Sequence, residues 1–117
     1  MSTSRAKTEV QAAEAVLLAG LASYQDGSIV SRVLISRDTG TITLFAFDEG
    51  QGLSEHTAPF DALVQMLEGE MKISIDGRPL IVKVGHLLLM PANHPHALKA
   101  VTRSKMLLTM IRSQATV

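Results

Sequence analysis

The chain has 117 residues, equal numbers of basic and acidic side chains (11 each) and no cysteine. This length suits one domain, and the balanced charge creates no field that would attract nucleic acid. The lack of cysteine excludes disulfides, thiolate catalysis and cysteine-bound zinc. Hydrophobic residues make up 46% of the chain, so it can bury a core and is not disordered by composition. We expect a single folded domain that binds no nucleic acid.

The first predicted element is a short helix within an N-terminal segment, residues 1–23. Residues 8–22 read TEVQAAEAVLLAGLA, and their alanines, leucines and glutamates favour a helix. Gly20 weakens the end of this helix, because glycine is a poor helix former.

No part of the sequence predicts a membrane segment. The most apolar early stretch, residues 15–22, is far shorter than the roughly 20 residues that span a bilayer. Lys7, Glu9 and Glu14 lie where the apolar middle of a signal peptide would begin. We therefore expect no membrane partner and a cytoplasmic location.

From residue 29 onward, apolar and polar residues alternate in short runs, as is typical of half-buried strands. Asp76-Gly77 lies between two of these runs and predicts a tight hairpin, because both residue types tolerate positive φ. Many short strands without intervening helices predict an all-β sandwich or barrel of antiparallel strands. The eight predicted strands cover residues 29–36, 41–47, 62–68, 71–76, 79–83, 86–91, 96–101 and 105–112.

The chain has four histidines, and histidine is both the commonest metal ligand and the residue that titrates near neutral pH. His94 and His96 lie one residue apart in the proline-braced stretch PANHPHALKA, residues 91–100. Strand alternation places His96 on one face with Leu98, and it places His56 on one face with Val64 and Met66 if no bulge intervenes. The two groups can therefore face one cavity. His86 follows Gly85 in a turn, and we expect no site role for it.

The region around the paired histidines resembles the second sequence motif of the small single-domain cupins. That motif runs Gly, five residues, Pro, one residue, Gly, two residues, His, three residues, Asn. Gly85, Pro91 and His96 fall on this spacing, whereas Asn93 stands at the second Gly and Ala100 at the Asn. The resemblance assigns the metal-binding histidine of the motif to His96.

The first cupin motif is degenerate in this chain. It runs Gly, five residues, His-any-His, three or four residues, Glu, six residues, Gly. Gly50 and Gly69 bound the motif and His56 takes the first histidine, but Ala58 replaces the second histidine and Ala62 replaces the glutamate. Two of the four metal ligands of the family are missing.

The resemblance spans roughly residues 24–112 and implies an antiparallel jelly-roll β-barrel over that range, with residues 113–117 as a C-terminal tail. It implies a site inside the mouth of the barrel, with His56 and His96 close together. It implies no particular activity, because the fold serves enzymes, binding domains and storage proteins alike.

A metal ion at this site would need a further ligand, because first-row metals generally take three or more from the protein. His94 shares the parity of His96 and completes a set of His56, His94 and His96 if the turn lets it point inward. Asp61 is an alternative that requires a bulge, since plain alternation points it outward. The site therefore holds either one divalent transition metal ion or none.

Alanine at positions 58 and 62 has a second consequence, because small side chains leave space inside a barrel. We predict a ligand pocket with partly apolar walls, in which methionine suits an irregular shape. The residues predicted to line it are His56, His96, Val64, Met66, Leu108, Met110, Phe47 and Phe60.

Two functions follow from these residues. The first is a small-molecule-binding protein with a degenerate histidine site, and the alternative is a metal-dependent enzyme, a small dioxygenase or isomerase, that uses His56, His94 and His96. We also expect a homodimer that involves the strands near residues 29–47, because cupins commonly dimerise and a small barrel has edges to cover.

Overall fold

The computed structural model describes residues 9–113 and contains two antiparallel β-sheets. The all-β class predicted from the sequence is confirmed. One short 3₁₀ turn, η1, precedes the strands. The elements are η1 (Leu18–Leu21), β1 (Ile29–Arg37), β2 (Gly40–Phe47), β3 (Gly52–His56), β4 (Phe60–Glu68), β5 (Glu70–Ile75), β6 (Arg78–Lys83), β7 (Leu87–Met90), β8 (His96–Ala100) and β9 (Ser104–Arg112).

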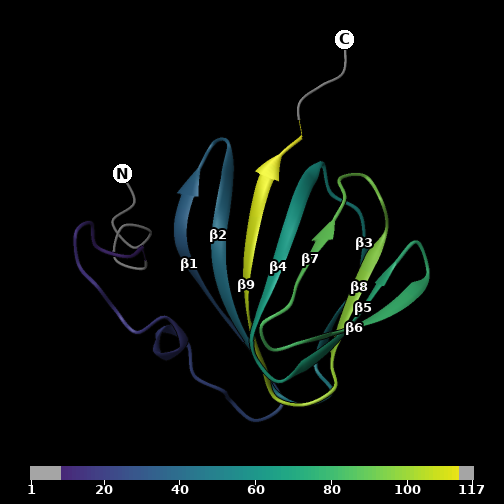
Figure 1. The fold of residues 1–117 in the computed structure, drawn as a ribbon, viewed down its shortest axis with the longest axis horizontal. Coiled ribbons are helices and arrows are strands. Elements are labelled where there is room, and N and C mark those ends of the chain that lie inside the picture. The colour runs from purple at the N-terminus through teal and green to yellow at the C-terminus, as the bar shows by residue number, and fades with distance from the viewer. Residues whose placement is uncertain (1–8, 114–117) are drawn as a thin grey trace.

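The larger sheet has the strand order β1-β2-β9-β4-β7, and the smaller sheet has the order β3-β8-β5-β6 (Figure 1). Each sheet turns its inner face toward the other, and the main core fills the space between them. Within residues 9–113 no strand pairing joins the two sheets, so the structure is a two-sheet jelly roll rather than the closed barrel expected. The largest fully buried side chains of this core are Phe47, Met71, Ile73, Met90, Met106 and Val64.

The predicted hairpin at Asp76-Gly77 is present between β5 and β6, where Ile75 pairs with Arg78. Asp76 has φ 53° and Gly77 has φ 78°, so both central residues take the left-handed conformation that a two-residue hairpin loop of this kind needs.

The predicted N-terminal helix is wrong over the described residues, where only η1 forms, from Leu18 to Leu21. The apolar residues of this segment pack sideways onto the outer face of the larger sheet, in a second core with Leu34 and Leu44. The Lys105 ammonium donates a hydrogen bond to the Ala19 carbonyl at 2.6 Å. Contacts with the sheet therefore decide the backbone here, and they override helix propensity. Within residues 9–113 no helix is long and apolar enough to cross a membrane.

Strand β3 was not predicted from the sequence, because GLSEH has no apolar alternation and four of its five residues are exposed. The chain then crosses from the smaller sheet to the larger one in residues 57–59, between β3 and β4. His56 and Ala62 therefore belong to different sheets, although one alternating pattern was expected to run through both.

Candidate ligand cavity

A cavity of about 40 Å³ lies between the inner faces of the two sheets. Its histidines come from the smaller sheet, and the larger sheet supplies methionine, leucine, alanine and phenylalanine side chains. The lining residues are Leu53, His56, Ala58, Phe60, Ala62, Met90, His96, Leu98, Met106, Leu108 and Met110. The walls are almost wholly apolar, with the two imidazole rings as their polar groups.

The cavity lies near one end of the sheets, because its polar residues occupy strand ends. His56 is the last residue of β3, His96 is the first of β8, and the two are register partners. Their ring centroids are 4.5 Å apart and the ring planes meet at 73°. The expectation that His56 and His96 lie together is met, and the cause is strand pairing between β3 and β8.

The two rings differ in their hydrogen bonding. His56 Nδ1 lies 2.9 Å from the Ser54 carbonyl oxygen, which can only accept, so Nδ1 carries the proton and Nε2 keeps its lone pair in the neutral ring. His96 is 5% exposed, and its Nδ1 has no hydrogen-bond partner. A buried nitrogen without a partner costs free energy, so a donor from a bound molecule would be favourable at this point.

Burial lowers the pKa of His96 below its ordinary value of 6.5, and the nearby His56 lowers it further, while the backbone of His94 opposes the shift. Desolvation disfavours the charged imidazolium, so His96 is neutral around pH 7. A neutral ring offers one lone pair and one N–H, which suits hydrogen bonding to a neutral or acidic group.

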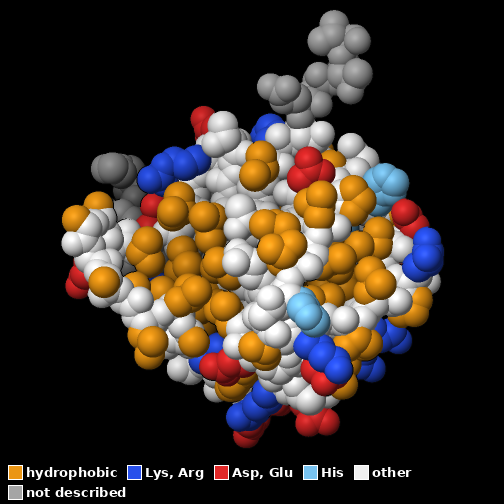
Figure 2. Space-filling view, viewed as in Figure 1, with side chains coloured by type: hydrophobic (Ala, Val, Ile, Leu, Met, Phe, Trp, Pro, Cys, Tyr) orange, Lys and Arg blue, Asp and Glu red, His pale blue; other side chains and the backbone are white. Residues whose placement is uncertain are grey.

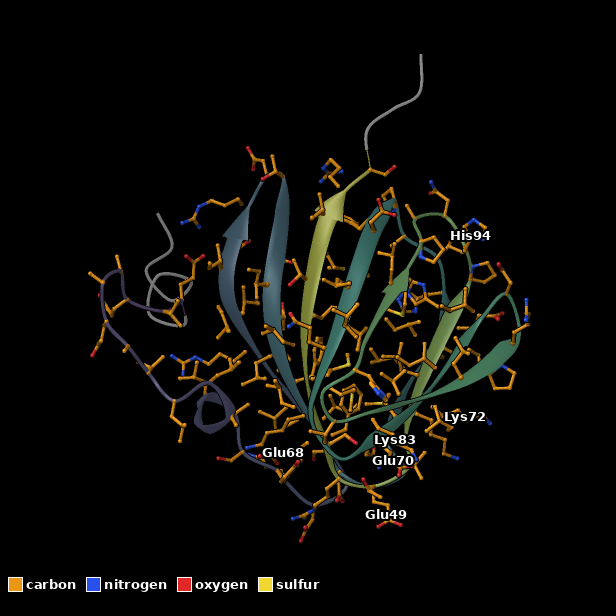
Figure 3. The ribbon with its side chains drawn as sticks, in the orientation of Figure 1. Glu49, Glu68, Glu70, Lys72, Lys83 and His94 are labelled. Atoms are coloured by element: carbon orange, nitrogen blue, oxygen red, sulfur yellow. The ribbon has the colours of Figure 1, made fainter. Side chains whose placement is uncertain are left out.

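His94 does not join this pair. Its Nδ1 lies 2.9 Å from a carboxylate oxygen of Asp76, and both side chains are half exposed. Figure 3 shows the labelled His94 at the rim of the molecule, beside the loop that precedes β8. The inward turn that His94 would need as a third ligand is not found, because Asp76, on the neighbouring hairpin, binds its ring from outside.

Backbone hydrogen bonds fix the turn that contains His94. The Asn93 amide donates to the Ala58 carbonyl at 2.8 Å, and the Asp76 amide donates to the Pro95 carbonyl at 2.9 Å. Asn93 has φ 65°, a left-handed conformation that glycine and asparagine adopt readily, which explains why it can replace the glycine of the cupin motif. Asp61 also serves this turn: its Oδ1 accepts a hydrogen bond from the Ala92 amide at 3.0 Å. It therefore points outward and is not a site ligand.

The donor set does not fit a resident metal ion held by three protein side chains. Across residues 9–113, no group of three or more histidine, cysteine, aspartate or glutamate side chains is arranged to hold one. His56 and His96 supply two imidazoles, and Ala58 and Ala62 line the cavity where the family motif has a histidine and a glutamate. Two ligands fall short of the three that such sites generally need.

The predicted pocket residues divide into two groups. Five line the cavity: His56, Phe60, His96, Leu108 and Met110. Phe47, Val64 and Met66 are instead packed in the core, with exposures of 0%, 0% and 2%. Their faces were assigned correctly as inner, but sequence alternation does not tell how deep a residue lies along its strand.

Sequence reasoning missed four lining residues: Leu53, Met90, Leu98 and Met106. Leu98 shares the parity of His96, which was a usable signal. Leu53 belongs to the strand that was not predicted. Ala58 and Ala62 line the cavity, as expected for small residues that leave room.

The two facing antiparallel sheets, with a histidine site at one end, define a jelly-roll domain. The family model described as "Cupin domain" matches residues 43–112. The chain therefore belongs to the cupin family.

Solved structures agree with this assignment. A conserved protein of unknown function from Streptococcus pyogenes is 34% identical, with a TM-score of 0.86 over 92% of this chain and 94% of that one. A cupin superfamily protein from Desulfitobacterium hafniense is 28% identical, with a TM-score of 0.81 over 92% of this chain and 96% of that one. A cupin 2 conserved barrel domain protein from Leptotrichia buccalis is 44% identical, with a TM-score of 0.78 over 80% of this chain and 46% of that one. The search of curated proteins found no match.

Proposed function

We propose that this cupin is a binding protein for a small, partly apolar molecule, held between its sheets beside His56 and His96. The observation that supports this most directly is the cavity itself. Nine of its eleven lining residues are apolar, and the other two are the histidines. A concave apolar site with a few convergent polar groups is the usual form of a small-molecule site.

The size of the cavity limits the ligand. Its 40 Å³ is more than the ~10–15 Å³ that a cavity needs to hold one water, and well below the ~150 Å³ of a cavity that holds benzene. A short apolar group fits without rearrangement. Met90, Met106 and Met110 line the walls, and methionine can change rotamer at low cost to admit a somewhat larger group.

The proposal can be tested by NMR of protein with labelled methionine methyl groups. Isovalerate and its neutral amide, isovaleramide, provide a short branched tail with two different polar heads. Binding in the cavity should shift the Met90, Met106 and Met110 signals saturably and leave the Met71 signal unchanged, because Met71 is fully buried and does not line the cavity. If both compounds leave the three cavity methionines unchanged up to ~20 mM, the proposed function is wrong.

The alternative, a metal-dependent dioxygenase or isomerase, is supported only by the contact between His56 and His96 and the free lone pair of His56. Titration of untagged protein with Zn²⁺, followed by desalting and metal analysis, separates the two functions. Less than about a tenth of an equivalent of retained metal contradicts the enzyme. Stoichiometric metal that is lost in His56→Ala and kept in His94→Ala would support it.

A further inference from the structure

The last residue on the inner face of β9 is Arg112, and it lies at the same end of the sheets as the cavity. Met106, Leu108 and Met110 line the cavity from alternate positions of β9, and Arg112 is the next residue on the same parity. Arg112 is the register partner of Phe60, which also lines the cavity. Its guanidinium carbon lies 4.9 Å from the centre of the Phe60 ring, so the charge sits over one wall of the cavity.

The Arg112 side chain contacts the backbone of the turn between β1 and β2. Arg112 Nε donates to the Asp38 carbonyl at 3.3 Å, and its amide donates to the Thr39 carbonyl at 2.8 Å. These contacts leave the terminal nitrogens of the guanidinium available to a further acceptor.

No carboxylate of residues 9–113 pairs with Arg112, in contrast to two other arginines. Arg37 binds Glu9 at 3.2 Å, and Arg103 binds Asp48 at 2.8 Å. Asp61 is close to Arg112 in sheet register, because it pairs with Ile111, but it lies on the outer face and accepts a hydrogen bond from the Ala92 amide.

We propose that Arg112 binds the carboxylate of the ligand, whose short apolar tail passes Phe60 into the cavity. This inference rests on the proposed function and names its ligand class: small carboxylic acids with a short apolar tail. A guanidinium binds a carboxylate through two parallel N–H···O bonds. Charge at the rim and apolar walls below it would fix the orientation of such a molecule, head outward and tail inward.

The same two compounds test this inference separately from the proposed function. In the unchanged protein, isovalerate should bind at least threefold more tightly than isovaleramide, as read from the cavity methionine signals. Arg112→Gln should weaken isovalerate binding three- to tenfold, leave isovaleramide binding unchanged and abolish the preference. Arg112→Lys should retain part of it. Arg78→Gln is the matched control, because it removes the same charge from β6, which contributes no lining residue.

Equal binding of the two compounds, or an Arg112→Gln variant that keeps the preference, would overturn the role of Arg112 while the cavity remains a binding site. Binding of neither compound would overturn the proposed function itself. A fold check by circular dichroism accompanies each variant, and retained isovaleramide binding shows independently that the cavity of Arg112→Gln is intact.

A separate observation concerns the outer face of the larger sheet. The N-terminal segment covers the part of it around Leu34, Leu44, Ala46 and Leu107, and the part around Leu87, Leu89 and Ile111 is exposed. Figure 2 shows hydrophobic side chains in several groups on the face turned to the viewer. Leu87, Leu89 and Ile111 are 62%, 52% and 61% exposed. Large apolar side chains exposed on one face of a folded domain are typical of an interaction site.

This face carries a basic residue, Arg37, at one end of a row and an acidic residue, Asp61, at the other end, so two copies of the face can pair opposite charges. Arg37, Gly40, Ile111 and Asp61 occupy one row across the sheet, from β1 through β2 and β9 to β4. A two-fold axis that runs parallel to the strands, between β2 and β9, places Arg37 of each copy opposite Asp61 of the other. The two charge pairs then lie at the two ends of the row, with Ile111 between them. We propose that a second copy of this chain packs on this face. The strands expected to dimerise, near residues 29–47, supply half of this row.

Sedimentation at 5–100 μM protein tests the face. The unchanged chain should be dimeric, and Leu89→Lys should be monomeric with its fold intact. Arg37→Glu and Asp61→Arg should each weaken the dimer at least fivefold, and the double swap should restore it, because the two charges then face each other in reverse. Glu9→Gln is the control: it removes the partner of Arg37 within the chain but leaves the charges on the face. A monomeric chain at 100 μM, or a double swap no better than the single variants, would overturn this proposal.

Discussion

Ala62 and Ala100 provide a direct test of whether the space between the sheets is real. Both are buried in the same core, with exposures of 3% and 1%, and only Ala62 lines the cavity. Both lie within strands, β4 and β8, where valine is favoured by propensity. The substitutions Ala62→Val and Ala100→Val therefore add the same two methyl groups in environments that differ mainly in the free volume beside them.

The magnitudes follow from the volume available. Two additional buried carbons contribute about 1.6 kcal/mol of transfer free energy, and forcing them into a filled core costs ~1–3 kcal/mol. At Ala100 the core is filled, so the cost of strain offsets or outweighs the transfer gain, and we expect the free energy of unfolding to fall by up to ~1.4 kcal/mol. At Ala62 the 40 Å³ cavity takes up much of the added volume, so part of the transfer gain is kept, and we expect the free energy of unfolding to rise by up to ~1.6 kcal/mol.

Urea denaturation at pH 7.5 measures both values, and the NMR titration with isovalerate measures binding. Ala62→Val should weaken binding at least tenfold because it fills the cavity, whereas Ala100→Val should leave binding within twofold. If the two variants lose equal stability, or if Ala62→Val still binds normally, the cavity is not the ligand site.

Three further predictions concern single residues. The pKa of His96 is lowered in the fold, so His96 contributes stability that is present above its ordinary pKa of 6.5 and is lost as the pH falls from there through the lowered value. Urea denaturation at pH 7.5 and 5.5 should show that the free energy of unfolding falls less in His96→Gln than in the unchanged protein. An equal fall in both proteins would contradict the argument. His94→Ala should cost less than ~1 kcal/mol, because its pair with Asp76 is half exposed, and it should leave isovalerate binding unchanged; a tenfold loss of binding would mean that His94 does reach the site. Gly69→Ala should lower the free energy of unfolding by at least ~2 kcal/mol, because Gly69 has φ 76° and an added Cβ would overlap the Arg103 carbonyl oxygen. Gly50 has φ 82° with open space around it, so Gly50→Ala should lower the free energy of unfolding about half as much. Thermal or urea unfolding measures both values.

Local chemistry made much of the fold predictable. Alternation identified most strands because apolar inner faces and polar outer faces follow the period of two. The Asp76-Gly77 hairpin was predictable because its turn demands positive φ at both residues. Strand β3 was not, since its register with β8 depends on partners distant in sequence, and a shift lies between Leu53 and His56.

The site was predictable to the extent that it depends on parity. His96 and its neighbour Leu98 keep their phase along β8, and both line the cavity. The direction of the His94 side chain depended instead on the Asp76 carboxylate, which comes from another hairpin. Residue spacing within one segment cannot predict that contact. Arg112 was equally hidden, because its position over Phe60 follows from the pairing of β9 with β4.

The N-terminal segment has a practical consequence for the choice of chain ends. The matching family model begins at residue 43, within β2, so a protein shortened to that boundary would look complete by family criteria. It would lack β1 and the residues that cover Leu44, Ala46 and Leu107, and it would leave β2 as an unprotected sheet edge. We expect such a protein to aggregate on expression, because it exposes this sheet edge and the apolar side chains that the lost residues cover.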